Sequence, residues 1–475
     1  MKISRYYGSL LFDDKEIDEI LEMVNPMLGP IATIEFLSSN NLNVGGEIAR
    51  SINRVNLMFF RKQLAKSKFQ DNVSRGFKGG RILNPFMTYI IPAGGKSLSK
   101  SWAISGSIGE FVERYIGAFS ILDEEQDLIC GTYKELSQKG YNLLNPDKMK
   151  FFHEIQYKKP GFLYKPFTPD TYICWAKYVN LKDKSEYLVP SQITYLSLFL
   201  KLGEQPIAYP TTGGLAFHDN YEKAYEHGLL EYLERDGINI AWISKIPANR
   251  IILDNEELRD LASQILGPLY DKLYIVKFPT EIKGLFIIGV MGFIKNIFVA
   301  GAAADISVKG ALLKALTEAT QSMASMRGFE IQKSYGLLKN VKLRYEDLDE
   351  FSLIMPYYSQ EDKRDIVDSW LKGLKEIKVS ELIEQERFKS IDELTNEVIN
   401  DKNYTILVKD FNVEKYLPLN KKLVRVFIPE VTPAHVPNTP FFGHPRYYEA
   451  PIIFGLSNKP YTIEDLNIKE PVPFP

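Results

Sequence analysis

The most informative stretch of the chain is residues 108–119, IGEFVERYIGAF. Its apolar residues recur with the period of a helix, so two glutamates three positions apart, Glu110 and Glu113, share one helical face. Arg114 stands four positions after the first glutamate, which is the spacing of a helical ion pair. The stretch therefore predicts a helix that carries two carboxylates among apolar neighbours.

A second stretch repeats this pattern. Residues 230–235, LEYLER, place Glu231 and Glu234 at the same spacing inside a helix predicted for residues 222–242. A solvated helix face with ordinary Glu/Arg pairs is the plain interpretation of either stretch. Acids among apolar neighbours are costly, however, unless they are paired or bind a metal.

A third predicted helix, residues 309–325, carries Glu318 and Gln321 at that spacing. Three helices that each offer two oxygen-bearing side chains can together form an oxygen-only site for Mg²⁺. This is the ion that accompanies nucleotide phosphates, so the sequence favours a nucleotide site.

The rest of the chain predicts an α/β (α+β) fold with mixed sheets. A turn is expected at Lys295–Asn296, and Ser390 with Glu393 has the spacing of a helix-capping box. Residues 1–80 form an N-terminal extension that is expected to be helical, from the spacing of apolar residues at 17–24. Strands are predicted at residues 186–210, 273–278, 285–293, 297–300 and 424–428.

Composition excludes several classes of protein. The 475 residues include 58 Lys and Arg and 60 Asp and Glu, a net charge of −2 that disfavours a globally basic nucleic-acid binder. The acidic start (Asp13, Asp14) does not fit a signal peptide, and the most apolar run, 284–294, is too short for a membrane helix. Two isolated cysteines, Cys130 and Cys174, indicate neither a disulfide framework nor a thiolate metal site. A cytoplasmic protein with no membrane and no nucleic-acid partner is expected.

One local excess of charge stands out. Between Arg50 and Arg81 there are nine Lys and Arg residues and a single acid, Asp71. A solvated helix face is the ordinary interpretation, and docking of an anionic partner or an acidic peptide is the alternative.

Several motifs fail on inspection. Gly95-Lys96-Ser97 resembles the end of a phosphate-binding P-loop, but Ile90 stands where that motif needs glycine. The five histidines are scattered with no metal-binding spacing, and only His227 falls within an acidic helix, as a structural hydrogen-bonder or a neighbour of the site. No nucleophile elbow of a hydrolase is present.

Four segments together resemble the YcaO family. They are residues 106–115 (GSIGEFVERY), 211–236 (TTGGLAFHDNYEKAYEHGLLEYLERD), 311–321 (ALLKALTEATQ) and 471–475 (PVPFP). The resemblance implies a catalytic domain over residues 81–475, with accessory helices at 341–403 and a Pro-rich tail at 471–475. It is closest to the ATP-dependent cyclodehydratases that form azoline rings in ribosomally made peptides.

The resemblance also implies site residues. ATP and Mg²⁺ would be held by helical acids, and the C-terminal carboxylate of Pro475 is the expected proton acceptor, with Arg114 assisting catalysis. The metal ligands would be Glu110, Glu113, Glu231, Glu234 and Glu318, and the other cofactor contacts Arg114, Gln321, His227 and Lys314.

Some positions depart from the family pattern. Thr212-Gly213-Gly214 replaces a common Ser-Asn-Gly, Lys314 replaces an arginine, and Met323 replaces another arginine, for which Arg327 is a candidate substitute. Lysine keeps the charge of arginine but loses its two-pronged geometry.

The activity implied is ATP-dependent cyclodehydration of Cys, Ser or Thr in a precursor peptide to thiazoline or oxazoline, as in bacteriocin and toxin biosynthesis. Expected partners are a precursor peptide with its leader, a separate E1-like leader-binding protein and a flavin-dependent azoline dehydrogenase, in a homo-oligomer or hetero-complex. Thioamide or amidine formation, and a catalytically weak scaffold subunit, remain alternatives.

Overall fold

The N-terminal region is described only in part. The computed structural model of the chain describes residues 23–24, 30–37, 47–53, 69, 91, 93–334, 342–417 and 419–474. Strands β1 (Ile31–Leu37) and β2 (Glu47–Asn53) lie in the extension, which corrects the helical prediction there, because β-branched and aromatic residues in IATIEFL favour strand. Most of the predicted helix at 17–24 and most of the basic stretch fall outside the described residues.

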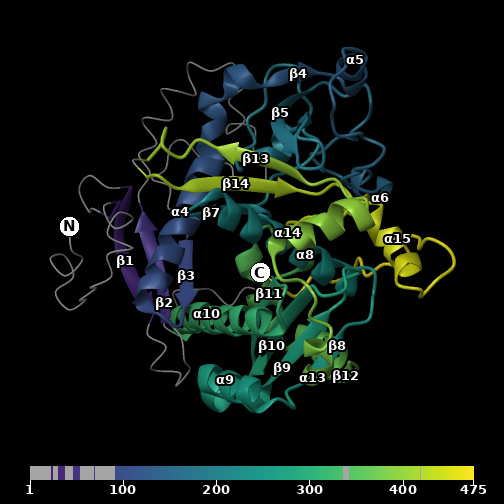
Figure 1. Cartoon of the computed structure of the whole chain (residues 1–475). Coiled ribbons are helices and arrows are strands. Elements are labelled where there is room, and N and C mark those ends of the chain that lie inside the picture. Colours follow the sequence, from purple (N-terminus) through teal and green to yellow (C-terminus); the bar gives the residue numbers. More distant parts are fainter. Residues whose placement is uncertain are drawn as a thin grey trace.

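Three sheets organise the described chain (Figure 1). The small sheet has the order β1-β2-β3 and is antiparallel, with β3 at Ala93–Ser97. The upper sheet in Figure 1 has the order β4-β5-β13-β14-β7, with β6 paired to β5. Its strands are β4 (Ile129–Gly131), β5 (Ile173–Asn180), β6 (Glu186–Pro190), β7 (Leu215–His218), β13 (Leu407–Phe411) and β14 (Lys422–Phe427).

The lower sheet has the order β11-β10-β9-β8-β12. Its strands are β8 (Asn249–Ile252), β9 (Leu273–Phe278), β10 (Phe286–Ile294), β11 (Ile297–Asp305) and β12 (Lys375–Lys378). Alternate residues of β10 face opposite sides: Ile288 packs in one core cluster with Leu312 and Leu316, and Ile287 packs in the other. The sheet is therefore covered on both faces.

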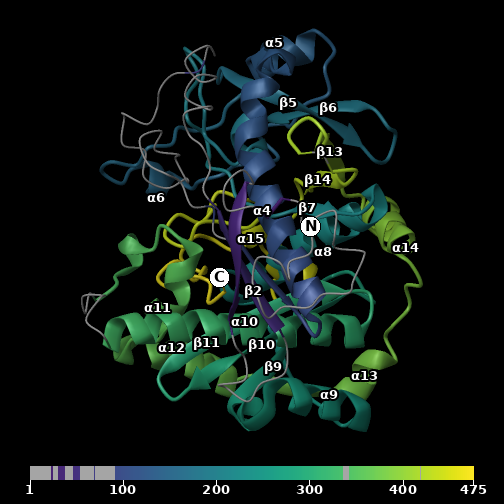
Figure 2. The same cartoon turned by 90° about the vertical axis from the view of Figure 1, so that its left-hand side faces the viewer.

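Three long helices lie at the junction of the sheets, as Figures 1 and 2 show from two sides. They are α4 (Lys100–Asp123), α8 (Tyr221–Trp242) and α10 (Val308–Ser334), which confirms the three predicted helices. Helix α8 contacts β7 and β14 of the upper sheet and β9 and β11 of the lower sheet. A helix covered on opposite sides has apolar residues around most of its circumference, which is why α8 buries Leu229, Leu230 and Leu233 alike.

Shorter helices complete the domain. The bounds are α5 (Tyr133–Gln138), α6 (Glu154–Tyr157), α7 (Ser191–Thr194), α9 (Glu256–Leu266), α11 (Ile354–Tyr358), α12 (Glu361–Lys372), α13 (Val379–Ile383), α14 (Ile391–Asn396) and α15 (Arg446–Ile453). No helix in the described ranges is both long and apolar enough to cross a bilayer.

The strand predictions are only partly right. The strands predicted near residues 273–300 and at 424–428 are present, with the expected turn at Lys295–Asn296 between β10 and β11. Residues 186–210 are not a long β segment, because β6 ends at Pro190 and a short helix follows. Buried apolar side chains in irregular backbone explain the mistaken pattern there.

The segment predicted as accessory helices contains a strand as well. Strand β12 pairs in parallel with β8, from Lys375 opposite Asn249 to Lys378 opposite Ile252. Ser390 caps α14 by accepting from the Glu393 N–H, but the Glu393 carboxylate accepts from the Lys389 N–H, so the reciprocal bond of a capping box is displaced by one residue.

The two cysteines form a disulfide, which corrects the prediction that they stand alone. Cys130 of β4 and Cys174 of β5 are directly opposite each other in an antiparallel pair, and their sulfur atoms are bonded. Side chains that face each other across neighbouring strands approach closely. Their separation of 44 residues in the sequence gave no sign of this.

Candidate active site

Carboxylates from the three long helices gather where the sheets meet. The pKa of Glu113 on α4 is raised well above its usual value, first by burial and also by the charges of Glu231 and Glu110. The pKa of Glu231 on α8 is raised by burial, and the charge of Glu318 on α10 adds to the shift. Charges of the predicted acids on all three helices thus contribute to one another's pKa shifts. We call Glu110, Glu113, Glu231, Glu234 and Glu318 the acid cluster.

Glu234 is the most deeply buried member of the acid cluster, at 8% exposed. Burial raises its pKa to about 8; the Arg235 charge opposes that shift, and the Glu318 and Glu231 charges add to it. Arg235 approaches at 3.6 Å between Nε and the Glu234 Oε1, which is too long for a close ion pair. Burial and the neighbouring carboxylates therefore favour the protonated form of Glu234 in the ligand-free protein.

Two members of the acid cluster are held by backbone donors. The Phe217 N–H on β7 donates to Glu113 at 2.8 Å, and the Gly214 N–H donates to Glu231 at 3.2 Å. Gly214 ends the Thr211–Gly214 turn, and Phe217 lies in β7, which follows the turn directly. The turn and the strand together thus fix the carboxylates of α4 and α8 relative to each other.

Strand β3 supplies further contacts. The Gly94 N–H donates to Glu110, which also pairs with Arg114 one helical turn later. Lys96 Nζ lies 2.7 Å from Glu318 Oε1. A Cβ atom on Gly94 would lie 2.5 Å from Gln321 Nε2, so the Gln321 side chain of α10 reaches the backbone of β3.

Lys96 is a residue of this region that the sequence pattern did not predict. Gly95-Lys96-Ser97 is not a P-loop, and no other motif includes this lysine. The usable signal was a lysine four residues before the N-terminus of the first acidic helix. Its partner, Glu318, lies more than 200 residues later in the chain, so only the fold joins them.

His227 and Lys314 lie beside the acid cluster rather than within its contacts. The His227 side chain is exposed, and its ring packs edge-on against His218 at 5.0 Å. Lys314 pairs with Asp305 at 2.7 Å. Their predicted contact with a nucleotide stays a prediction.

The departures from the family pattern have clear local explanations. Met323 is buried with 4% exposure in the core beneath α10, where a charged side chain would be costly. Gly213 is buried against Ala434, and a Cβ there would lie 3.1 Å from the Ala434 Cβ. The side chain of Arg327 lies outside the described residues.

The donor set suits Mg²⁺ with a nucleotide. Within the described ranges no three acidic, histidine or cysteine side chains converge as a ready-made metal cage. Mg²⁺ at nucleotide sites is commonly held by one or two carboxylates together with phosphate oxygens and water. The acid cluster offers carboxylates of that kind, and a buried acid that holds a proton is one whose charge a cation would restore.

The C-terminal tail is anchored next to helix α8. The Trp242 indole N–H donates to the backbone oxygen of Glu470, and the Tyr357 hydroxyl and Lys363 bind the Glu470 carboxylate at 2.7 and 2.8 Å. The Phe474 ring packs edge-on against Phe278 at 5.3 Å. The tail is therefore ordered up to Phe474, and Pro475 lies outside the described residues.

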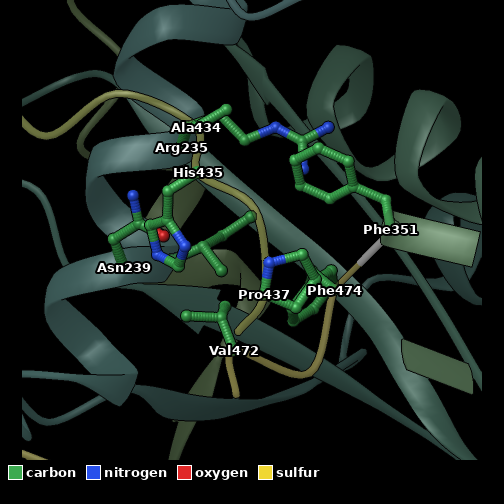
Figure 3. A pocket seen from close by; sticks show the side chains of 9 residues that line it. Arg235, Asn239, Phe351, Ala434, His435, Pro437, Val472 and Phe474 are labelled. Atoms are coloured by element: carbon green, nitrogen blue, oxygen red, sulfur yellow. The ribbon is translucent and has the colours of Figure 1, made fainter. Parts of the chain in front are cut away.

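A small cavity separates this tail from α8 (Figure 3). Arg235 and Asn239 of α8 line one side, and Val472 and Phe474 of the tail line another. The His435 Nε2 atom in its wall is buried without a hydrogen-bond partner. Because Arg235 also approaches Glu234, the cavity and the acid cluster are adjacent.

Comparison with known proteins agrees with this geometry. Residues 94–432 match the model of the YcaO cyclodehydratase family, which is described as ATP- and Mg²⁺-binding. No curated protein matches the chain in sequence.

Three solved structures with the same fold are informative. A heterocyclase in complex with substrate and cofactor has a TM-score of 0.67 at 18% identity, and the match covers 96% of this chain but 56% of the heterocyclase. YcaO from Methanopyrus kandleri, bound with AMPPCP and Mg²⁺, has a TM-score of 0.54 at 14% identity, with 85% and 86% of the two chains covered. The E. coli microcin synthetase McbBCD complex with pro-MccB17 bound has a TM-score of 0.55 at 15% identity, with 95% and 98% covered.

Proposed function

Because the chain belongs to the YcaO family, whose members bind ATP and Mg²⁺, we propose that it is an ATP-dependent cyclodehydratase acting on a ribosomally made peptide. The observation that carries the proposal is the acid cluster, in which three helices bring carboxyl groups together. Burial and mutual repulsion raise the pKa values of Glu113, Glu231 and Glu234 there. Such carboxylates favour binding of a divalent ion with the nucleotide that it accompanies.

The residues have distinct parts in this proposal. Glu110, Glu231, Glu234 and Glu318 would hold Mg²⁺, which would offset the charge of the nucleotide phosphates. Glu113 keeps α4 against β7 through its bond to Phe217. Arg114 offsets the charge of Glu110 and faces developing charge on the phosphates. Bound ATP supplies the phosphoryl group that converts a peptide carbonyl oxygen into a leaving group.

The anchored tail supports azoline chemistry. In the proposed reaction a Cys, Ser or Thr side chain of the peptide attacks the preceding carbonyl carbon, and the carbonyl oxygen accepts the phosphoryl group of ATP. Phosphate then departs with that oxygen while the amide nitrogen loses its proton and the C=N bond of the azoline forms. The thiol or hydroxyl proton needs an acceptor, for which the C-terminal carboxylate of Pro475 is our candidate. Val472 and Phe474 hold the tail beside Arg235, one residue short of that carboxylate.

Solved structures of similar proteins support the partners that we propose. A heterocyclase solved with substrate and a microcin synthetase complex solved with pro-MccB17 support a peptide substrate and a multi-protein assembly for this chain. We therefore propose a leader-bearing precursor peptide, a separate leader-binding protein and an azoline dehydrogenase as partners. Thioamide or amidine formation with the same ATP chemistry is the second candidate, because the acid cluster alone does not distinguish these reactions.

The test compares the wild-type protein with Glu231→Gln and with Glu222→Gln, supplied with ATP, Mg²⁺, the candidate partner and its precursor peptide. Glu222 is exposed on the first turn of the same helix, which makes it a matched control outside the acid cluster. Phosphate release and peptide mass are recorded together. We expect loss of one water mass per ring for wild type and the control, and a fall of about 100-fold or more for Glu231→Gln, as for other preorganised charges.

Other outcomes select among the alternatives. Turnover of ATP with a different mass change on the peptide would replace azoline formation by thioamide or amidine chemistry. Absence of nucleotide binding and of turnover, with a partner and peptide known to interact, would favour a scaffold subunit.

A further inference from the structure

Lys96 occupies the acid cluster in a way that the proposed function does not explain. Its ammonium nitrogen lies 2.7 Å from Glu318 Oε1, with both side chains about 30% exposed. Its charge also lowers the pKa of Glu234 on a different helix. One lysine thus serves acids from α8 and α10, which are the positions proposed for Mg²⁺.

The position of Lys96 is fixed by its backbone. Strand β3 pairs with β2 in a register that sets Lys96 opposite Ile48, and β3 packs directly on α4. A Cβ atom on Gly95 would lie 1.8 Å from the Ala103 carbonyl oxygen, so strand and helix are in backbone contact there. The Lys96 side chain therefore starts from a rigid support and moves only at its flexible end.

For electrostatic reasons, we expect the Lys96–Glu318 ion pair to depend on whether Mg²⁺ is bound. A lysine ammonium is a compact point charge that binds both carboxylates and phosphates. A divalent ion on Glu318 would repel the ammonium that now pairs with it, while the phosphates of the accompanying nucleotide would attract it. Because the Lys96 side chain is partly exposed and flexible, its ammonium group can exchange one partner for the other without rearrangement of β3.

We propose that Lys96 is a placeholder cation, which pairs with Glu318 in the metal-free protein and transfers to the nucleotide phosphates when Mg²⁺ takes its place. This inference rests on the proposed nucleotide site and adds strand β3 to it. It predicts effects of opposite sign: without Lys96, Mg²⁺ alone meets less competition, while the nucleotide loses a charged contact.

The experiment measures binding without turnover. Melting temperature and binding isotherms are recorded in EDTA, with Mg²⁺ alone, and with saturating Mg²⁺ plus AMPPCP, for Lys96→Met, Lys96→Arg and Lys409→Met. Lys409 makes a 2.7 Å ion pair with Glu124 at the C-terminal end of α4, partly buried like that of Lys96 but away from the acid cluster. It therefore reports the effect of losing an ordinary ion pair.

We expect Lys96→Met to bind Mg²⁺ alone more tightly than wild type and AMPPCP about tenfold or more weakly, which is the loss expected for one charge-assisted hydrogen bond. Lys96→Arg should keep most of the nucleotide affinity, and Lys409→Met should lower the melting temperature equally in all three conditions. If Lys96→Met behaves like Lys409→Met while wild type binds Mg²⁺ and AMPPCP, the placeholder role is overturned. If wild type itself binds neither, the proposed function fails instead.

Discussion

Helix α8 carries two buried carboxylates, Glu234 and Asp236, whose surroundings are opposites. Both are nearly inaccessible, at 8% and 5% exposed, and two residues of separation turn them to different sides of the helix. Asp236 accepts bonds from the Thr432 N–H and hydroxyl at 2.8 and 2.9 Å and pairs with Arg446 at 2.8 Å. Glu234 has the longer 3.6 Å approach of Arg235 and carboxylates as neighbours.

The two sides of α8 differ in how completely their charges are paired. Arg446 extends the Asp236 side into a closed network, because it also binds Glu281 and the Tyr404 hydroxyl. Lys402 Nζ also lies 3.8 Å from Glu281 Oε2, so the two acids there face two cations. On the Glu234 side the charges are left unbalanced, and the deficit is what a bound cation and nucleotide would correct. Equal burial therefore accompanies a structural ion pair at Asp236 and, in the function that we propose, a ligand-binding position at Glu234.

The largest expected effect comes from breaking the ion-pair network around Asp236. Arg446→Met leaves Asp236 buried without its cation, and loss of one partner of a buried ion pair costs about 3–5 kcal/mol of unfolding free energy. Denaturant unfolding measures this loss. The double variant Arg446→Met/Asp236→Asn should recover part of it, and a single variant as stable as wild type would contradict the comparison.

Substitution of Glu234 should change the unfolding free energy in the opposite direction. Glu234→Gln removes an acid whose pKa burial raises to about 8, so the metal-free protein should gain on the order of 1–3 kcal/mol of unfolding free energy near pH 8. Phosphate release with Mg²⁺ and peptide should fall by about 100-fold, because a proposed metal ligand is lost. A variant that is both less stable and fully active would assign Glu234 to the fold.

The smallest expected effect is a dependence of stability on pH that arises from Glu234. Between pH 4.5, the ordinary pKa of a glutamate, and about 8, the folded state keeps a proton on Glu234 that the unfolded state releases. The unfolded state then binds fewer protons, so this group lowers stability as pH rises, by at most about 1.4 kcal/mol per pH unit. The difference in unfolding free energy between Glu234→Gln and wild type, measured in EDTA, should grow over that range; a constant difference would show that Glu234 does not titrate there.

Local pattern was enough to predict the helices that carry the site. Each acidic pair sits in a run whose apolar residues have helical spacing, so α4, α8 and α10 and their carboxylates follow from the sequence. The resemblance to the YcaO family, now supported by a match over residues 94–432, predicted ATP and Mg²⁺ as the cofactors.

Pairings between distant residues could not be predicted in this way. Lys96 with Glu318, Cys130 with Cys174 and Arg446 with Asp236 join residues that only the folded chain brings together. The polar strand β12, KEIK, has no apolar alternation to reveal it, because it is an edge strand with exposed side chains. Its pairing with β8 is a tertiary property.

Strand β12 also limits how freely the chain can be recombined. Residues 341–403 look in sequence like an insertion that could be exchanged between relatives, yet Lys375–Lys378 form the edge of the lower sheet and Val379 and Leu382 fill its core. A deletion or chimaera that removed the whole segment would expose the β8 edge and an apolar surface, both of which promote aggregation. Modular exchange in this region therefore has to retain β12 and α13 and make its junctions in the stretches before and after them.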